Sequence, residues 1–261
     1  MNASHQTPAR PAAVAQDVDP QLLADLVDAN HILFNEKVLD AFGHVSVRHD
    51  KDPNRFLLAR NLAPALVEAE DIMEFDLDGN PLHGDERRPY LERFIHGEIY
   101  RARPDVVAVV HSHSPSVIPF SVVKSTRLRP ICHMCGFLGR GPAIFDIRDH
   151  FGDGTDLLIR NKEMGAALAR DLGQDNVVLM RGHGSTTVAP SLRLAVFRAI
   201  YTEVNARLQA TAMTMGPVTY LSDAEAEAVL EMHESQLHRP WALWKAAAQA
   251  GREEYKKALG L

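Results

Sequence analysis

Two histidines one residue apart follow the most apolar run of the sequence. In the stretch VVAVVHSHSPS, His111 and His113 come after five aliphatic residues and just before a Ser-Pro pair. Side chains of an extended strand alternate between its faces, so positions i and i+2 point the same way. Two imidazoles on one side of a strand end can bind a single divalent cation. Alternatively, both rings hydrogen-bond to backbone or water and bind no ligand.

A third histidine follows another apolar run, in VVLMRGHGSTTVA. The glycines on either side of His183 allow the backbone to turn sharply and to approach another strand end closely. By itself, Gly-His-Gly is an ordinary turn. However, open sheets collect their sites at strand ends, so two buried strands that both finish in histidine predict one shared site. Three histidines leave a bound metal with open coordination positions, which catalysis requires.

A glutamate that could transfer protons lies near the start of a predicted helix, YLERFIHGEIYRAR. This helix precedes the His-x-His strand, and Glu92 could act there as a general acid or base. Most helical glutamates are solvated, so a surface position is the alternative. His96 lies one turn later on the same helix face and either braces the helix or joins the site.

Composition excludes several classes of function. The chain has 261 residues, 46% of them hydrophobic, and a formal charge of −6 without a block of like charge, so nucleic acid is not an expected partner. No apolar stretch approaches the ~18 residues of a membrane span, and the start of the chain has no signal-peptide core. Cys132 and Cys135, in CHMC, fit packed free thiols in a reducing compartment better than a redox or zinc centre. We therefore expect a cytoplasmic protein.

The order of elements predicts one domain. Residues 1–18 are rich in Ala, Pro and small polar residues, which predicts a flexible arm, and residues 19–261 form a single domain with a helical C-terminal tail. A helix begins after Asp19-Pro20, and residues 44–60 read as a hairpin. A second strand pair is expected to turn at Asp78-Gly79-Asn80, and a later helix ends at Gly173. Strands in the middle with helices between and after them predict a three-layer domain around a mixed sheet.

These motifs together resemble the class II aldolase/adducin family. The matching pieces are GHVSVR, LERFIHGEIYRARPDVVAVVHSHS and VVLMRGHGSTTVA, and their order and spacing hold across roughly residues 20–215. The resemblance implies a three-layer α/β/α fold with a mixed, mainly antiparallel sheet, and usually a homotetramer with active sites between subunits. It also implies a divalent metal held by His111, His113 and His183, and it gives Glu92 the role of catalytic acid/base.

Two segments depart from the members of this family that cleave sugar phosphates. Those members carry a serine pair just before the glutamate and a Gly-containing loop earlier, which together hold the phosphate. Here the corresponding segments read RRPYL and ARNLAPALV. A phosphate cradle needs small residues with available N–H groups and hydroxyls, which Tyr90 and Leu91 do not offer. A sugar-phosphate aldolase, dehydratase or epimerase is therefore an alternative, not the expectation.

Arginines stand near these segments instead. Arg60 and Arg88, with Arg48 and Arg87, could pair bidentately with a substrate carboxylate, or each could be a solvated surface charge. His44 stands where the family usually has Asn, so a contact to substrate has changed character. We predict these substrate-binding residues: Arg60, Arg88, His44, His133 and Tyr90.

The pattern is most similar to the branch of the family that decarboxylates hydroxylated aromatic or heteroaromatic dicarboxylates, such as the 3-hydroxy-2-methylpyridine-4,5-dicarboxylate decarboxylase of vitamin B6 breakdown. This resemblance implies a small aromatic carboxylate as substrate, Mn²⁺ as cofactor with Zn²⁺ or Co²⁺ as alternatives, and reprotonation of a carbanion by Glu92. A metal-free binding module like the head of adducin is the alternative from another class. The three histidines and the glutamate argue against it.

Overall fold

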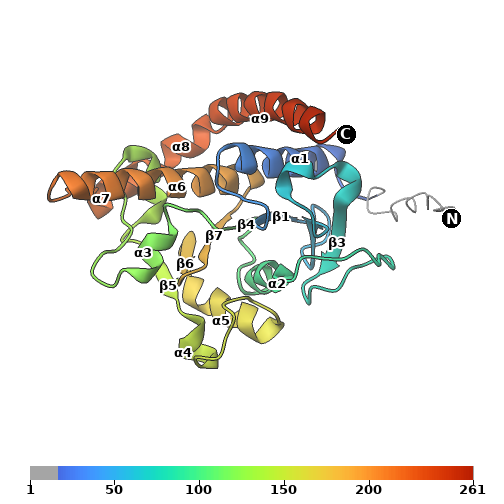
Figure 1. The fold of residues 1–261 in the computed structure, drawn as a ribbon, viewed down its shortest axis with the longest axis horizontal. Helices are drawn as coiled ribbons and strands as arrows, with labels where there is room; N and C mark the ends of the chain where they lie inside the picture. The colour runs from blue at the N-terminus through green and yellow to red at the C-terminus, as the bar shows by residue number, and fades with distance from the viewer. Residues whose placement is uncertain (1–16, 261) are drawn as a thin grey trace.

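A seven-stranded sheet forms the middle layer of the molecule (Figure 1). The computed structural model describes residues 17–260, without the side chains of residues 231–233. The strand order is β3-β2-β1-β4-β7-β6-β5, and within the described chain all neighbours are antiparallel except β5 and β6. The expected mixed, mainly antiparallel sheet is confirmed. The strands are β1 (His44–Arg48), β2 (Arg55–Ala59), β3 (Ile72–Asp76), β4 (Ala108–Ser112), β5 (Ala143–Phe145), β6 (Val177–Met180) and β7 (Gly184–Ala189).

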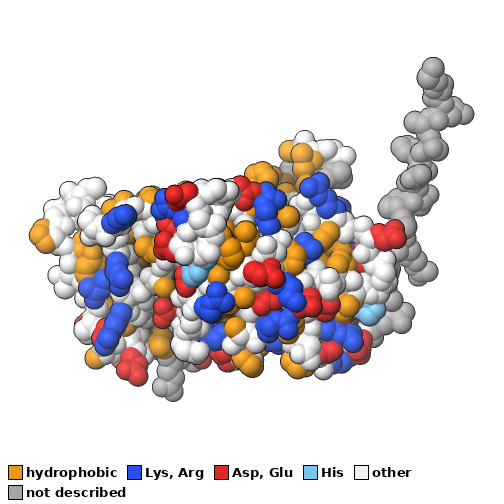
Figure 2. Space-filling model, turned by 90° about the horizontal axis from the view of Figure 1, so that it is seen from below, with side chains coloured by type: hydrophobic (Ala, Val, Ile, Leu, Met, Phe, Trp, Pro, Cys, Tyr) orange, Lys and Arg blue, Asp and Glu red, His pale blue; other side chains and the backbone are white. Residues whose placement is uncertain are grey.

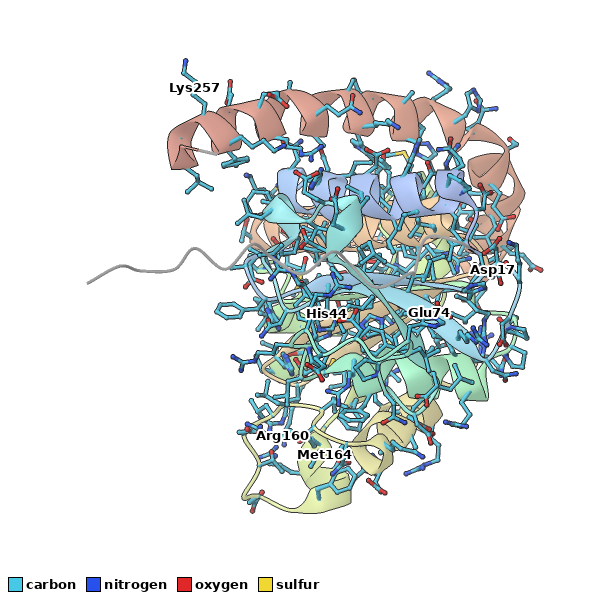
Figure 3. All side chains as sticks on the ribbon, turned by 90° about the vertical axis from the view of Figure 1, so that its right-hand side faces the viewer. Asp17, His44, Glu74, Arg160, Met164 and Lys257 are labelled. Carbon is cyan, nitrogen blue, oxygen red and sulfur yellow. The ribbon has the colours of Figure 1, made fainter. Side chains whose placement is uncertain are left out.

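Helices cover both faces of this sheet, as the expected three-layer fold requires. On one face α1 packs against α6, and α9 lies outside α1; on the other face α2 packs against α5. Figure 3 shows the layers edge-on, with His44 and Glu74 in the sheet and Arg160 and Met164 on the α5 side. The α-helices are α1 (Pro20–Asn35), α2 (Arg93–Ala102), α3 (Ile118–Val122), α4 (Ile147–Phe151), α5 (Lys162–Leu172), α6 (Leu192–Met215), α7 (Asp223–Ala228), α8 (Leu230–Gln236) and α9 (His238–Leu259). The described residues also form the 3₁₀ helices η2 (Pro64–Leu66), η3 (Ala69–Asp71) and η4 (His133–Leu138).

Local capping residues fix the helix ends that the sequence predicts. Asp19 accepts a hydrogen bond from the Gln21 amide at 2.9 Å, and Pro20 occupies the first turn of α1, where a missing N–H costs nothing. Helix α5 ends at Gly173, whose φ of 53° lies in the left-handed region that glycine adopts without strain.

The strands β1, β2 and β4 agree with the sequence prediction, whereas the strand pair expected after β2 does not form. β1 and β2 form the predicted hairpin, and β4 is buried along its whole length, as expected for a strand covered on both faces. The predicted strand pair at Asp78-Gly79-Asn80 is wrong, because only β3 forms, and a single bridge joins Phe75 to Pro81 beyond the turn. Proline has no N–H to donate, so the ladder does not continue there.

The surface agrees with the composition. Basic and acidic side chains are interspersed on the face shown in Figure 2. Residues 1–16 of the predicted arm lie outside the described residues. Of the other two, Asp17 pairs with Lys51, and Val18 is buried in the core, so the packed domain begins before Asp19. Within residues 17–260, no helix has the length and apolar character needed to cross a membrane.

Candidate metal and active site

The His-x-His motif lies at the end of the central strand. His111 is fully buried in β4, and His113 follows the strand directly, with its ring centroid 5.1 Å from that of His111. β1 lies antiparallel beside β4, with His44 directly opposite His111. The alternation of the strand thus brings the two imidazoles together, as the spacing predicts.

His183 reaches the same place from the turn between β6 and β7. Gly182 has a φ of 66°, which the sharp turn needs, and a Cβ on Gly184 would lie 1.9 Å from the carbonyl oxygen of Ser112. Only a residue without a side chain allows β7 to approach the end of β4 so closely. The ring of His183 is consequently 4.9 Å from that of His111 and 5.0 Å from that of His113.

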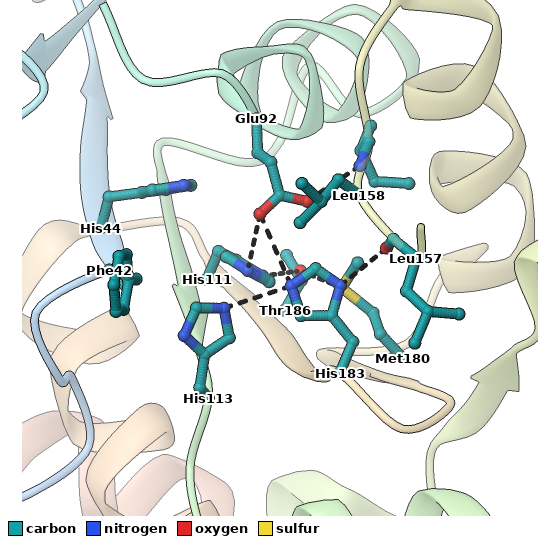
Figure 4. A network of polar contacts seen from close by, with 12 residues as sticks. Phe42, His44, Glu92, His111, His113, Leu157, Leu158, Met180, His183 and Thr186 are labelled. Atoms are coloured by element: carbon teal, nitrogen blue, oxygen red, sulfur yellow. Dashed lines mark hydrogen bonds and ion pairs between the residues drawn. The ribbon is translucent and has the colours of Figure 1, made fainter. Parts of the chain in front are cut away.

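Glu92 completes the cluster from the start of helix α2. It occupies the N-cap position of α2 but makes no capping bond with its side chain, which is buried and directed at the histidines (Figure 4). The amide of Ile159 donates to Oε1 at 2.9 Å, and Oε2 lies 3.6 Å from His111 Nε2 and 3.5 Å from His183 Nε2. The surface position considered for this glutamate is therefore wrong.

Each histidine of the cluster is held by a different acceptor at its Nδ1 atom. His183 Nδ1 donates to the Leu157 carbonyl at 2.9 Å, and His113 Nδ1 donates to the Asp40 carboxylate at 3.2 Å. His111 Nδ1 lies 3.4 Å from Thr186 Oγ1, whose own hydrogen goes to the Met180 sulfur. A carbonyl and a carboxylate can only accept, and the threonine hydrogen is already used, so each ring carries its proton on Nδ1.

The Nε2 lone pairs of the three rings therefore point to a common centre. One ligand atom from each of Glu92, His111, His113 and His183 lies within 4.8 Å of all the others, and His113 Nε2 is 3.1 Å from His183 Nε2. His111 Nε2 is buried and has no hydrogen-bond partner among the described residues. An orphaned buried acceptor is costly, and a divalent cation would satisfy it. The residues present thus fit a metal.

The electrostatics of the site keep the rings of His111 and His44 neutral but favour a proton on His183. Burial lowers the pKa of His111 and of His44 well below the usual value, with the neighbouring histidines adding to the shift. Burial also lowers the pKa of His183, but the hydrogen bond and charge of Glu92 outweigh it, so that this pKa is raised. A neutral imidazole is the form that binds a metal.

A cavity of about 280 Å³ opens beside this cluster. It is lined by Phe42, His44, Asn61, Tyr90, Leu91, Glu92, His113 and Leu158. Two of the predicted substrate-binding residues are thus at the cavity: His44, and Tyr90, whose ring lies 4.6 Å from that of His44 and whose hydroxyl donates to the Leu62 carbonyl. The other three lie elsewhere in the chain.

Arginines near the site are mostly engaged in the fold. Arg60 pairs with Asp71 at 2.7 Å and does not line the cavity. Arg48 is buried and donates to four backbone carbonyls, and Arg87 pairs with the carboxylate two residues before it. Arg88 is exposed and also outside the cavity lining. Carboxylate recognition by Arg60 and Arg88 stays a prediction. The donors of Arg48 and Arg87 are already used in contacts within the fold.

His133 is separated from the cluster within this chain. It lies in η4 and lines a different cavity, of about 490 Å³, together with Tyr201 of α6 and Leu243 of α9. Its predicted contact with substrate stays untested. In contrast, Asp40 holds a ring of the cluster, yet nothing near it in the sequence signals this role, because its partner is 73 residues away.

Comparisons with known proteins identify a family and a fold. The family model described as Class II Aldolase and Adducin N-terminal domain matches residues 24–210. Decarboxylase tropJ of Talaromyces stipitatus is 39% identical over 244 residues, which cover 85% of this chain and 91% of that protein. The 3,4-dihydroxyphthalate decarboxylase of Arthrobacter keyseri is 34% identical over 184 residues, 67% of this chain and 71% of that one. The solved L-fuculose 1-phosphate aldolase from Glaciozyma antarctica covers 90% of each chain with a TM-score of 0.73 and 24% identity, a likeness of fold.

Proposed function

The chain belongs to the class II aldolase and adducin family, and on this premise we propose that it is a metal-dependent decarboxylase of a hydroxylated aromatic dicarboxylate. The observation that carries the proposal is the convergence of three Nε2 lone pairs and one carboxylate beside a cavity. The names of two relatives, both decarboxylases, support the reaction class. This cluster of potential metal ligands argues against a binding module without a metal.

His111, His113 and His183 would hold the metal through their Nε2 atoms. We choose manganese on the strength of the family resemblance, and zinc and cobalt accept the same nitrogen ligands. A divalent cation bound here supplies Lewis-acid stabilisation of the negative charge that develops as CO2 leaves, a contribution of several kcal/mol.

Glu92 is the proton donor in this proposal. Its Oε1 is anchored by the Ile159 amide, which leaves Oε2 on the side of the histidines and the cavity. When the carbon–carbon bond to the carboxylate breaks, the electron pair stays on the ring carbon, and a proton from Glu92 completes the product. Leu91 and Leu158 line the same cavity and give it apolar walls beside this carboxyl.

The substrate could contain either a benzene ring or a pyridine ring. A phthalate is a benzene dicarboxylate, so the name of the Arthrobacter keyseri relative favours a benzene ring, whereas the resemblance seen in the sequence favours a pyridine ring. Both rings share a hydroxyl group and two carboxylates. We propose this shared pattern as the substrate class.

Release of CO2 from a panel of hydroxylated benzene and pyridine dicarboxylates, with manganese added, tests the proposal. The Glu92→Gln variant should bind metal normally and lose turnover by about 10²-fold or more, because the amide cannot transfer the proton. Glu98→Gln is the matched control, since Glu98 is also buried in α2 but pairs with Arg101 outside the cluster. Normal turnover by Glu92→Gln would exclude the assigned acid.

Metal content and phosphate binding separate the alternatives. His111→Ala and His183→Ala should each lose both metal and activity. Protein that purifies without metal and takes up none would indicate an adducin-like binding module. Competitive binding of inorganic phosphate or a phosphosugar would instead indicate a sugar-phosphate enzyme. The homotetramer implied by the resemblance also belongs to the proposal, and light scattering of the purified protein measures it.

A further inference from the structure

A buried chain of four polar side chains, alternating between α2 and β1, leads to the cavity. The Tyr100 hydroxyl lies 2.7 Å from Ser46 Oγ, Ser46 Oγ lies 2.6 Å from His96 Nδ1, and His96 Nε2 lies 2.7 Å from His44 Nδ1. All four residues are at most 2% exposed. Of these four, only His44 lines the cavity. The candidate mechanism uses none of the other three.

The direction of the hydrogen bonds in this chain follows from its far end. At that end, Ser46 Oγ is the hydrogen-bond partner of the buried Tyr100 hydroxyl among the described residues. The tyrosine hydrogen must then go to Ser46, because a buried O–H without an acceptor costs free energy. Ser46 has one hydrogen, and having accepted from tyrosine it donates this hydrogen to His96.

The same logic continues through the two rings. Burial lowers the pKa of His96 to about 3, so this imidazole carries one proton at neutral pH. Since His96 Nδ1 accepts from Ser46, its proton is on Nε2 and is donated to His44 Nδ1. His44 therefore carries its own proton on Nε2, at the opposite edge of the ring.

We propose that this chain makes His44 a fixed, neutral hydrogen-bond donor to an anionic oxygen of the substrate, with His96, Ser46 and Tyr100 as positioning residues. The inference rests on the proposed function for the kind of substrate. The His44 ring extends from β1 toward Glu92 and lies 5.1 Å from the ring of His111, so a donor at Nε2 faces the site (Figure 4). The oxygen belongs either to the carboxylate that is retained or to the ring hydroxyl.

The tautomer of His44 can be measured without any turnover. In the zinc-loaded, diamagnetic protein, two-bond ¹H–¹⁵N correlations distinguish a protonated from an unprotonated ring nitrogen, and the His44→Phe variant assigns the signals. We expect His44 as the Nε2–H tautomer. The Ser46→Ala variant removes the donor to His96, so a substantial fraction of His44 should change to the Nδ1–H form. Ser46→Cys, with a weak S–H donor, replaces it if the alanine variant does not fold.

A matched control separates this effect from the loss of a buried hydroxyl. Thr202 is 1% exposed, and its hydroxyl donates to the Arg198 carbonyl within α6. Thr202→Val removes that hydroxyl at constant shape and should leave the His44 tautomer unchanged. An Nδ1–H tautomer of His44 in the unaltered protein, or no change in the Ser46 variants, would overturn the inference even if the decarboxylase activity is found.

Substrate analogues identify the oxygen that His44 binds. Loss of a hydrogen bond to a charged oxygen should raise KM in the His44→Phe variant by about tenfold to a hundredfold with the full substrate. With the analogue that lacks the bound oxygen, the same variant should change KM less than about twofold. One analogue lacks the second carboxylate and the other lacks the hydroxyl. If the His44→Phe variant raises KM equally with both analogues and with the full substrate, then His44 binds neither group. If the unaltered protein turns over none of these compounds, only the proposed function is refuted.

Discussion

Replacing Asp40 by asparagine tests how the chain orients one ring of the cluster. The Asp40 carboxylate lies 3.2 Å from His113 Nδ1 through Oδ1 and 3.3 Å through Oδ2. Oδ1 also accepts from the amides of Phe42 and Gly43, at 2.8 and 3.0 Å. Asparagine keeps an oxygen for these two amides and removes the negative charge. The variant therefore changes the electrostatics of His113 more than the shape of the loop.

The expected loss is in metal affinity. A carboxylate that accepts from Nδ1–H stabilises the tautomer with the lone pair on Nε2 and makes this nitrogen a better ligand. A hydrogen bond to a charged group contributes ~1.5 to 3 kcal/mol. Because the Asp40 side chain is 50% exposed, solvent screens the interaction, and we use the lower end of this range, about 1.5 kcal/mol. This corresponds to a metal Kd about tenfold higher.

Competition with a chelator of known affinity measures this Kd for zinc and for manganese. Asp171→Asn is the matched control, because Asp171 lies 3.3 Å from a ring nitrogen of His150, outside the cluster. This control should bind metal as the unaltered protein does. If Asp40→Asn also binds metal with unchanged affinity, then the Asp40 carboxylate does not set the tautomer of His113. The hydrogen bond between them then does not orient this ring for metal binding.

Two further predictions concern the backbone approach and the thiols. Gly184→Ala places a Cβ 1.9 Å from the Ser112 carbonyl, so thermal melting should show about 3 kcal/mol of destabilisation, whereas Gly154→Ala, with no atom within 4 Å, should melt unchanged. The Cys135 thiol, 3.1 Å from Cys132 Sγ, donates to it and lowers the pKa of Cys132 to about 7, while it raises that of Cys135. Alkylation of Cys132 by iodoacetamide, followed by mass spectrometry, should therefore be constant above pH 8 and fall about tenfold near pH 6, and a midpoint near 8.5 would contradict this contact.

The sequence predicts the ligand histidines because local geometry brings them together. The i and i+2 spacing of His111 and His113 depends only on the alternation of a strand, and the glycines around His183 specify a turn and a close approach. The strand that joins the two motifs was not predicted. β7 reads GSTTVA, with three polar residues in a row, and yet it is buried along its whole length. Its Ser185 and Thr186 are buried because they lie opposite Ser112 and His111 in the register, which is a tertiary contact.

The role of an arginine is also difficult to predict from sequence, because its partners lie far away along the chain. The sequence offers a guanidinium such as Arg48 as a ligand for a carboxylate, because it cannot tell which carbonyls will lie nearby. In the fold, Arg48 donates to carbonyls of the loop after β1 and of the end of α2, so its donors are already used. A buried guanidinium must satisfy its donors where it lies, and this requirement takes precedence over any ligand. Partners that are distant along the chain decide the role of such residues.

The imidazoles of the site share one structural principle. Each ring has two nitrogens, and in each case a neighbour from another element fixes the state of Nδ1: a carboxylate for His113, a carbonyl for His183, a hydroxyl for His111 and a second imidazole for His44. Three rings carry the proton on Nδ1 and present a lone pair at Nε2. His44 instead accepts a hydrogen bond at Nδ1 and presents a proton at Nε2. In the proposed site the same residue type would thus supply three metal ligands and one hydrogen-bond donor, and the residues behind the rings would determine which role each one has.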